Sequence, residues 1–227
     1  MGPYPATTFL GGLDQPDLDA LVGAGRAITH RPGEMVLHEG GPSTSVVFVT
    51  SGTVKLVKSA PNGRVVVLEL RGPGEMMGDL GVIDGEPRSA SAVALDQVEL
   101  VVLPASAFLE LTRSRPGIAQ AMISTLVRRL REASGRQLEL GSTDVVGRVC
   151  ARLAQLCTSH GQASEDGVLL DRAISQQELA DWCGSSRDSI VRALGELRQR
   201  GWIATGRQRV LVVEPDLVRA RADGAPD

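Results

Sequence analysis

The sequence predicts an α+β fold in which an N-terminal antiparallel β-roll, of the jelly-roll type, precedes a long central helix and a winged helix-turn-helix. Three observations lead to this prediction. Short apolar runs separated by turn residues fill residues 28–104, a heptad-like repeat follows over 116–142, and helix-turn-helix spacing appears over 175–197. A chain of 227 residues is long enough for two small domains. We expect three regions with the boundaries 1–115, 116–143 and 144–227.

The first region is expected to begin with a frayed segment and a helix over residues 14–27, with Asp14 as its N-cap and Pro16 in its first turn. Turn-forming residues then recur about every ten positions, which is typical of an antiparallel sandwich or barrel. Pro61-Asn62-Gly63 resembles a hairpin tip. The predicted strands are residues 35–38, 46–50, 54–59, 65–70, 89–94 and 98–103. So many short strands need two sheets if each is to bury one face.

The central helix is expected to follow a short helix over residues 104–112, to begin at Pro116 and to end near Gly141. Apolar positions along it alternate in steps of four and three, which is the seam of a coiled coil. That seam predicts a homodimer. An amphipathic helix lying on its own domain is the alternative. The seam residues are Ala119, Ile123, Leu126, Leu130, Ala133, Gln137 and Leu140.

The C-terminal region begins with a predicted helix over residues 144–158 and a polar loop that extends to Gly167. Helix-turn-helix spacing follows, with a small residue at Ala180, a turn glycine at Gly184 and an apolar anchor at Ile190. Ser175 and Ser186 are placed to cap the two helices. The second helix would bury Ile190, Ala193, Leu194 and Leu197, which leaves its other face free.

That free face carries charges suited to reading DNA. Arginine binds guanine bidentately and a carboxylate accepts from cytosine. Residues 201–213 read as a strand, a turn and a strand, which form a wing, and from Arg187 to Arg209 six arginines outnumber two acidic residues. The predicted DNA-binding residues are Ser186, Arg187, Asp188, Ser189, Arg192, Arg207 and Arg209. Ordinary solvated charges are the alternative. Trp182 and Trp202 are expected to pack rather than to stack on bases.

A possible anion site interrupts the strand pattern between Gly78 and Ser91. A helix start with free backbone N–H groups, an arginine at Arg88 and a neighbouring hydroxyl at Ser89 are the parts of a phosphate site. Asp79 would repel an anion there unless it accepts from a sugar hydroxyl. In the alternative interpretation, Arg88 pairs with Asp84 or Glu86.

Together, the β-roll, this loop, the central helix with Arg128-Arg129-Leu130, the run Asp144-Val-Val-Gly-Arg148 and the winged helix resemble the CRP/FNR family of transcription regulators. The resemblance covers about residues 10–213 and is greatest to the cyclic-AMP receptor protein branch. It implies a cyclic-nucleotide-binding β-roll in which Arg88 and Ser89 hold the cyclic phosphate and Asp79 the ribose hydroxyl. The implied effector-binding set is Gly78, Asp79, Leu80, Arg88, Ser89, Ala90 and Ser134. The family's base readers fall on Arg187, Asp188 and Arg192.

Three positions depart from that branch, which has glutamate at Asp79 and Asp188 and threonine at Ala133. The shorter Asp79 and the missing hydroxyl at Ala133 leave the adenine site incomplete, and Asp188 leaves the preferred base open. The expected effector is therefore cyclic AMP or another cyclic nucleotide, with cyclic di-GMP or no effector as alternatives. The implied partners are double-stranded DNA with a pseudo-palindromic operator, a second copy of the chain and RNA polymerase.

Several classes of protein are disfavoured by composition. No run of roughly 18 apolar residues and no signal peptide is present, which predicts a cytosolic protein without membrane contact. Cys150, Cys157 and Cys183 lack C-x-x-C spacing, so no metal or iron–sulfur cluster is expected, although Cys150 and Cys157 share a helix face that would suit a redox pair. No catalytic grouping indicates an enzyme. A regulatory scaffold that acts through protein partners is the alternative to a DNA-binding regulator.

Overall fold

The computed structural model describes residues 3–60, 65–171, 175–206 and 209–224, and of residues 138–142, 159–160 and 171 it describes only the backbone. The chain divides into two compact units, Met1–Glu132 and Ala133–Asp227. The long helix α4 (Pro116–Ser142) contributes to both units. The hairpin tip predicted at residues 61–63 lies outside the described residues.

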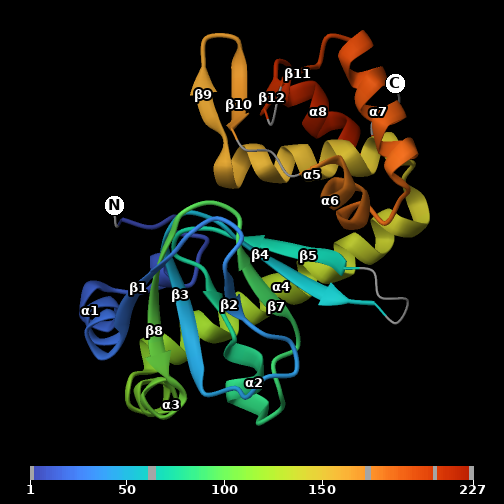
Figure 1. Ribbon diagram of the computed structural model, residues 1–227. Helices are drawn as coiled ribbons and strands as arrows, with labels where there is room; N and C mark the ends of the chain where they lie inside the picture. Colours follow the sequence, from blue (N-terminus) through green and yellow to red (C-terminus); the bar gives the residue numbers. More distant parts are fainter. Residues whose placement is uncertain (1–2, 61–64, 172–174, 207–208, 225–227) are drawn as a thin grey trace. The chain divides into compact units, whose positions relative to one another are not determined.

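Two antiparallel four-stranded sheets form the first unit (Figure 1). One sheet has the order β1 (Arg26–His30), β8 (Val98–Pro104), β3 (Ser45–Ser51) and β6 (Met76–Met77). The other has the order β2 (Met35–Leu37), β7 (Ser91–Ala94), β4 (Val54–Ser59) and β5 (Val65–Arg71). The predicted β-roll is therefore confirmed. Strands β1 and β6 were not predicted.

Strand β3 is buried on both faces, which explains its unbroken apolar run. Val46 and Phe48 face a cluster that includes residues of the helices, whereas Val47 and Val49 face a cluster formed with strands of the other sheet. Because successive side chains of a strand point to opposite faces, this one strand joins the two halves of the core.

The N-terminal segment is part of that core, so the prediction of a frayed start is wrong. Phe9 is 1% exposed and stacks on Phe48 with ring centroids 5.7 Å apart. The short 3₁₀ helix η1 (Leu10–Gly12) follows, and then α1 (Gln15–Ala24), whose N-cap Asp14 accepts from the Asp17 N–H. Helix α1 ends earlier than predicted because the chain then passes close to β8. A Cβ atom at Gly25 would lie 2.4 Å from Val101 Cγ1.

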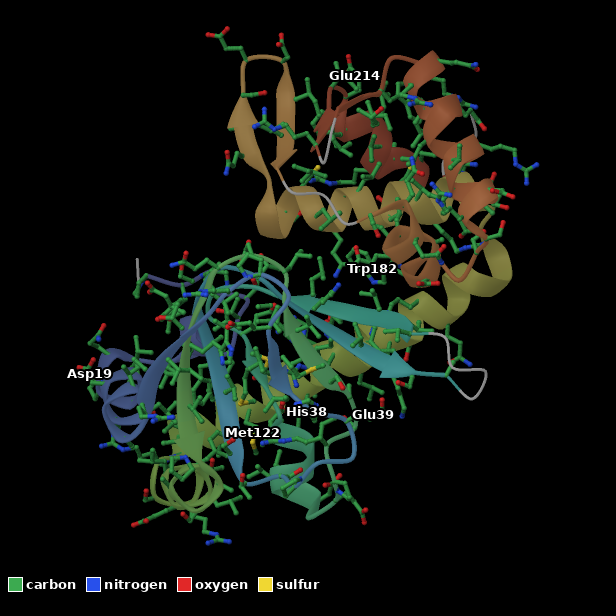
Figure 2. The ribbon with its side chains drawn as sticks, viewed as in Figure 1. Asp19, His38, Glu39, Met122, Trp182 and Glu214 are labelled. Carbon is green, nitrogen blue, oxygen red and sulfur yellow. The ribbon has the colours of Figure 1, made fainter. Side chains whose placement is uncertain are left out.

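Two further helices flank the sheets before α4 begins. They are α2 (Asp79–Asp84) and α3 (Ala105–Ser114). Helix α4 buries Ile118, Ala121 and Thr125 in the first unit, and Met122 packs against the same cluster (Figure 2).

Helix α4 also exposes an apolar stripe on another face. Ile123 is 52% exposed, Val127 43% and Leu130 68%. The two interpretations of this helix are therefore compatible, because one face packs on its own roll while another remains free. Of the remaining predicted seam residues, Ala119 and Leu126 are half-buried, Ala133 and Gln137 are exposed, and the side chain of Leu140 lies outside the described residues.

The second unit is a winged helix-turn-helix with an added hairpin. Its helices are α5 (Val145–His160), α6 (Gln176–Trp182), α7 (Arg187–Gln199) and α8 (Pro215–Ala222). Its strands form one sheet in the order β11 (Ile203–Gly206), β12 (Arg209–Val212), β10 (Gly167–Asp171) and β9 (Gln162–Ser164). The polar loop predicted up to Gly167 is wrong, because β9 is a strand. All three of its residues are exposed, so no apolar alternation reveals it.

Helix α8 braces the start of α5. Asp144 caps α5 by accepting from the Gly147 N–H, and Arg221 Nη2 lies 2.7 Å from the other Asp144 oxygen. A Cβ at Gly147 would lie 3.0 Å from Arg221 Nη1. Arg148 bonds the Thr143 and Cys183 carbonyls, which joins this point to the end of α6. Thr143 and Asp144, just after α4, are thus held by Arg148 of α5 and Arg221 of α8 respectively.

Candidate functional site

The Arg88 side chain is held in a cradle at the start of α2. Its Nη1 donates to the Gly78 carbonyl at 2.5 Å, and its Nη2 donates to the Ser45 carbonyl at 2.6 Å. Gly78 has φ +75°, and a Cβ there would lie 2.2 Å from Arg88 Nη1. A glycine is therefore favoured both by the left-handed backbone and by the guanidinium that lies against it.

This guanidinium is a buried positive charge bound only by neutral oxygens. Arg88 is 6% exposed, and within the described part of the chain no carboxylate forms an ion pair with it. The alternative pairing fails, since Asp84 instead accepts from the Glu86 N–H at 3.0 Å. Burial lowers the pKa of Arg88, and the nearby charge of Asp79 opposes that effect. A buried cation without a counter-ion is costly unless an anion joins it.

Arg129 of α4 occupies one oxygen of Asp79. Arg129 Nη1 lies 2.8 Å from Asp79 Oδ2, and Nη2 donates to the Met76 carbonyl. Asp79 is 2% exposed, and burial lowers the pKa of Arg129. The sequence reasoning placed Arg129 in a family motif but did not assign it to the site. The site and the long helix are thus joined by a buried ion pair.

A second group of charges lies between β5 and α4. Arg71 is 3% exposed, and its Nη1 lies 2.6 Å from Glu69 Oε1 and 3.4 Å from Glu75 Oε1. Burial alone would lower the pKa of Arg71, but these two carboxylates outweigh it and raise the pKa. Glu75 also lies 3.9 Å from Arg128 Nη2. None of these ion pairs was predicted, because the charged residues come from three separate segments of the chain.

The remaining predicted effector residues are less enclosed. Leu80 is 46% exposed, Ser89 is exposed and Ala90 is half-buried. The loop is held in place by two backbone hydrogen bonds. The Arg88 N–H donates to the Gly41 carbonyl, and the Arg88 carbonyl accepts from the Gly40 N–H. Ser134 belongs to the second unit, where it is exposed. The structure therefore brings Gly78, Asp79 and Arg88 together and leaves the role of the others untested.

The predicted recognition helix has the expected two faces. Ser175 forms a capping box with Glu178 at the start of α6, and Ser186 caps α7 by accepting from the Ser189 N–H. Helix α7 buries Ile190, Ala193, Leu194 and Leu197, as predicted. Its exposed residues include Arg187, Asp188, Val191 and Arg192. Arg187, Asp188 and Arg192 therefore lie on the solvent-exposed face near the helix N-terminus, where Arg187 donates to Gln176 and Arg192 donates to Ser189.

The wing adds a further arginine beside this helix. Arg209 begins β12 and is exposed, whereas Arg207 lies outside the described residues. Both tryptophans pack against arginines. The guanidinium of Arg200 lies 5.1 Å from the centroid of the Trp202 ring, and Trp182, labelled in Figure 2, is 8% exposed. The expectation that they serve packing is confirmed.

Other kinds of site find no support within the described residues. Cys150, Cys157 and Cys183 form no disulfide, and burial raises the pKa of Cys157. No group of three metal-ligating side chains is found among these residues. No helix there combines the length and apolar character needed to cross a bilayer.

Comparison with protein families identifies two domains. The model of a cyclic nucleotide-binding domain matches residues 27–115, and that of a Crp-like helix-turn-helix domain matches residues 147–221. The first match contains the Arg88 cradle, and the second contains α6, α7 and the wing.

Individual relatives match nearly the whole chain. A CRP-like cAMP-activated global transcriptional regulator from Mycobacterium tuberculosis is 31% identical over 93% of this chain and 94% of its own length. The solved catabolite activator protein of Thermus thermophilus is 30% identical, with a TM-score of 0.54 over 98% of this chain and 99% of that one. The c-di-GMP responsive global regulator CLP of Xanthomonas campestris shares the fold at 24% identity, with a TM-score of 0.76 over 88% of this chain and 99% of that one.

Proposed function

The chain belongs to the CRP/FNR family of transcription regulators and is a DNA-binding regulator with a cyclic nucleotide-binding domain, and on that premise we propose that it is a homodimer gated by a cyclic nucleotide. Its relatives are regulators rather than enzymes. We propose cyclic AMP as the first candidate effector, since that is the ligand named for the M. tuberculosis relative. We place the protein in the cytoplasm, where a regulator meets chromosomal DNA.

The observation that carries the effector proposal is the buried guanidinium of Arg88, which donates to neutral oxygens and forms no direct ion pair among the described residues. A cyclic phosphate brings one negative charge and exposed oxygens, which would both neutralise this guanidinium and accept from its remaining N–H groups. In the proposed complex the Ser89 hydroxyl adds a donor, and Gly78, Leu80 and Ala90 line the approach. A ribose hydroxyl that donates to Asp79 would share the carboxylate with Arg129.

Gating follows from that shared carboxylate. Arg129 lies on α4, so a ligand that changes how Asp79 is bonded also changes what holds this helix to the roll. For the effector to switch the protein, it must bind the DNA-competent arrangement more tightly than the idle one. Ala133 and Ser134 would contribute from α4, and Ala133 offers no hydrogen bond where the cyclic-AMP branch has threonine.

Dimerisation is proposed through the exposed stripe of α4. Ile123, Val127 and Leu130 recur at helical spacing and remain exposed, so a second copy would bury them. Ala119, Leu126, Ala133, Gln137 and Leu140 complete the predicted seam. Two recognition helices then read half-sites about 34 Å apart, which requires a pseudo-palindromic operator. RNA polymerase is the proposed partner once the dimer is bound.

The effector is tested by calorimetric titration with cyclic AMP, cyclic GMP and cyclic di-GMP, alongside the Arg88→Gln variant. We expect one nucleotide to bind with a Kd below about 1 mM and the variant to lose at least tenfold in affinity. Absence of binding by all three would reject the cyclic-nucleotide proposal and leave DNA binding intact. That outcome would favour the second candidate, a regulator that needs no cyclic nucleotide, because Arg129 already supplies Asp79 with a partner.

DNA reading is tested by fluorescence anisotropy with operator and random duplexes. Arg192→Ala is expected to lose affinity for the operator alone, by about 1 to 3 kcal/mol, because a base reader discriminates between sequences. Arg209→Ala is the matched variant on the wing, and it should weaken both duplexes alike, as a phosphate contact does. Equal losses on both duplexes for Arg192→Ala would reject its assignment as a base reader.

A further inference from the structure

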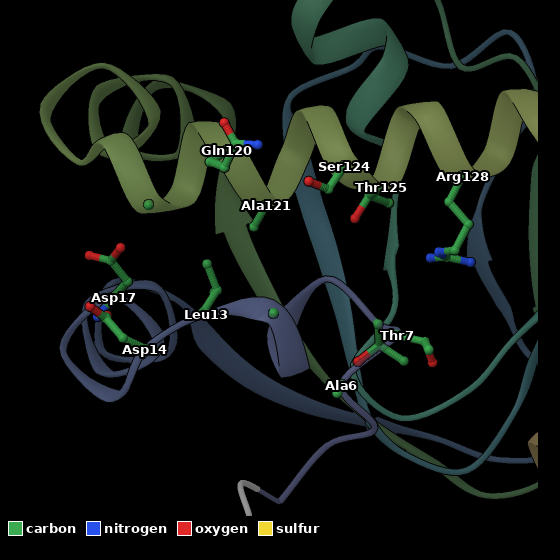
Figure 3. Close-up of a pocket in the computed structure, with 13 residues that line it drawn as sticks. Ala6, Thr7, Leu13, Asp14, Asp17, Gln120, Ala121, Ser124, Thr125 and Arg128 are labelled. Carbon is green, nitrogen blue, oxygen red and sulfur yellow. The ribbon is translucent and has the colours of Figure 1, made fainter.

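Charged side chains line the cavity of the first unit that Figure 3 shows, but each of them already has a partner in the chain. Asp14 caps α1, Asp17 lies 2.9 Å from Arg115, and Arg128 lies 3.1 Å from Glu132. The charges of this cavity are therefore satisfied within the chain. An unmatched group remains instead on the exposed face of α7 in the second unit.

That group is an apolar side chain on the face proposed to read bases. Val191 is 39% exposed, and Val191 and Leu217 of α8 are the large apolar side chains that the described part of the second unit exposes. A single exposed valine is common on protein surfaces. The position of Val191 is the unusual feature, because it lies among the charged residues Asp188 and Arg192 of the same exposed face.

The buried residues of α7 show where this face lies. Successive helical residues are about 100° apart, so Asp188, Arg192 and Gly195 lie about 150 to 170° from the centre of the buried side. Val191 lies about 110° from the same centre and about 40° from Gly195. Residues four positions apart on a helix are neighbours, so Val191 and Gly195 form adjoining parts of one surface.

Gly195 gives this surface a bare stretch of helix backbone. A Cβ atom there would meet, within 4 Å and beyond its own helix backbone, only Arg198 Nη2 at 3.7 Å, which is an ordinary contact distance. The packing of the chain therefore does not require glycine, and glycine destabilises a helix interior relative to alanine. A glycine does allow another molecule to approach the backbone closely. Gly195 is thus a second observation, independent of Val191, that points to a partner on this face.

The surrounding charges identify that partner as DNA. Arg187 and Arg192 are exposed on α7, and Arg198 donates from its last turn to Thr205 of β11 at 3.1 Å. Such a surface suits the phosphates that border a major groove. Within the groove, the C5-methyl group of thymine is the apolar feature of the base edges, and apolar side chains contact it. An apolar residue among charged readers therefore matches a thymine.

We propose that Val191 is a specificity-determining residue that selects a thymine by contact with its C5-methyl group, and that Gly195 lets α7 approach the base edges closely enough for this contact. The inference rests on the proposed base-reading role of α7. It adds a preference for an A·T pair at one position of each half-site. The arginines do not supply this preference, because arginine pairs with guanine.

Replacement of thymine by uracil is the direct test, because uracil lacks only the methyl group. The full chain first selects its operator from a pool of random duplexes, with and without cyclic AMP, and each thymine is then replaced in turn. Fluorescence anisotropy should show that uracil at one position of a half-site weakens binding about fourfold, the factor expected for the burial of one methyl group. At that position a 5-methylcytosine·guanine pair, which restores the methyl group, should bind more tightly than a cytosine·guanine pair.

Val191→Ser removes the apolar contact but keeps a similar helix propensity at an exposed position, so the variant should fold normally. In this variant the uracil replacement should change the affinity by less than about twofold, which is the usual error of additivity. Equal uracil effects in the parent and in Val191→Ser would overturn the inference and leave base reading by the charged residues intact. Equal affinity of the parent for operator and random duplexes would reject both proposals.

Two further variants complete the test. Leu217→Ser removes the other exposed apolar side chain of the second unit and should retain the fourfold uracil effect, whereas its loss there too would mean that the effect does not come from Val191. Gly195→Ala should stabilise α7, because alanine is the better helix former, and yet weaken operator binding at least about fourfold. If Gly195→Ala binds the operator as tightly as the parent, the close approach of α7 is refuted, and the methyl contact with it.

Discussion

Gly78→Ala gives the sharpest test of the Arg88 cradle because Gly85 provides its control. Both glycines flank α2 and both have positive φ, +75° and +80°. A Cβ at Gly78 would lie 2.2 Å from Arg88 Nη1 and 3.2 Å from Leu37 Cδ1, whereas a Cβ at Gly85 meets nothing within 4 Å. Alanine therefore adds backbone strain at both positions but a collision only at Gly78.

The expected difference follows from those contacts. Left-handed backbone costs an alanine about 1 to 2 kcal/mol, which applies to both variants. At Gly78 the guanidinium must also leave the Gly78 and Ser45 carbonyls, and each hydrogen bond to a charged group is worth about 1.5 to 3 kcal/mol. New acceptors would offset part of this loss. We expect Gly78→Ala to cost about 2 kcal/mol more than Gly85→Ala.

The assay must report on the first unit. Both tryptophans, Trp182 and Trp202, lie in the second unit, so their fluorescence would follow the wrong part of the chain. Hydrogen exchange of the β3 and β8 amides, which belong to the core strands of the roll, measures the free energy of opening directly. Equal losses for the two variants, within about 0.5 kcal/mol, would refute the account of the cradle.

Three further predictions concern contacts outside the cradle. Asp79→Asn removes the counter-charge of buried Arg129 and should cost the roll about 3 kcal/mol, measured by the same exchange experiment. Leu130→Glu should halve the mass seen by light scattering, because it places a carboxylate in the proposed dimer seam. Arg221→Ala removes the partner of Asp144 and should destabilise the second unit by about 1 kcal/mol, measured by tryptophan fluorescence in urea.

Two of these predictions have a control in the same chain. Leu80→Glu, at an exposed leucine outside α4, should leave the mass unchanged. If the dimer is lost in both variants, the loss in Leu130→Glu does not show that α4 forms the dimer interface. Arg219→Ala alters an exposed arginine on the same helix as Arg221, and an equal effect would mean that the Asp144 contact contributes nothing. For Asp79→Asn, unchanged protection of the roll would show that Arg129 does not depend on this carboxylate.

The parts of the fold that could be predicted are those with strong local patterns. Helix α4 begins at Pro116 as predicted and ends at Ser142, one residue beyond the predicted Gly141, and both serine caps of the helix-turn-helix are present. The missed elements lack such patterns. Strand β6 has only two residues, and β9 is polar throughout. The N-terminal segment is ordered by contacts with Phe48, far away in the sequence.

The Arg88 site was likewise predictable only where its residues lie close together in the sequence. Gly78 and Arg88 lie ten residues apart and were recognised from one motif, whereas Arg129 reaches Asp79 from fifty residues away. Charge pairing of that kind depends on how α4 lies against the roll, which no local pattern reveals. Periodicity predicted Ile123 and Leu130, which belong to both the predicted seam and the exposed stripe. It missed Val127, because the exposure of this residue depends on which face of α4 the roll covers.

The arrangement around Gly78 separates fixed parts from adjustable parts for anyone who wishes to convert this protein into a biosensor. A side chain at Gly78 would displace the Arg88 guanidinium, so libraries that vary this position would disturb the proposed anchor for the anion. Ala133 is exposed and carries no such restriction, whereas Asp79 is 2% exposed and pairs with Arg129. Selection for new effectors should therefore keep the cradle and the Asp79–Arg129 pair, and diversify Ala133.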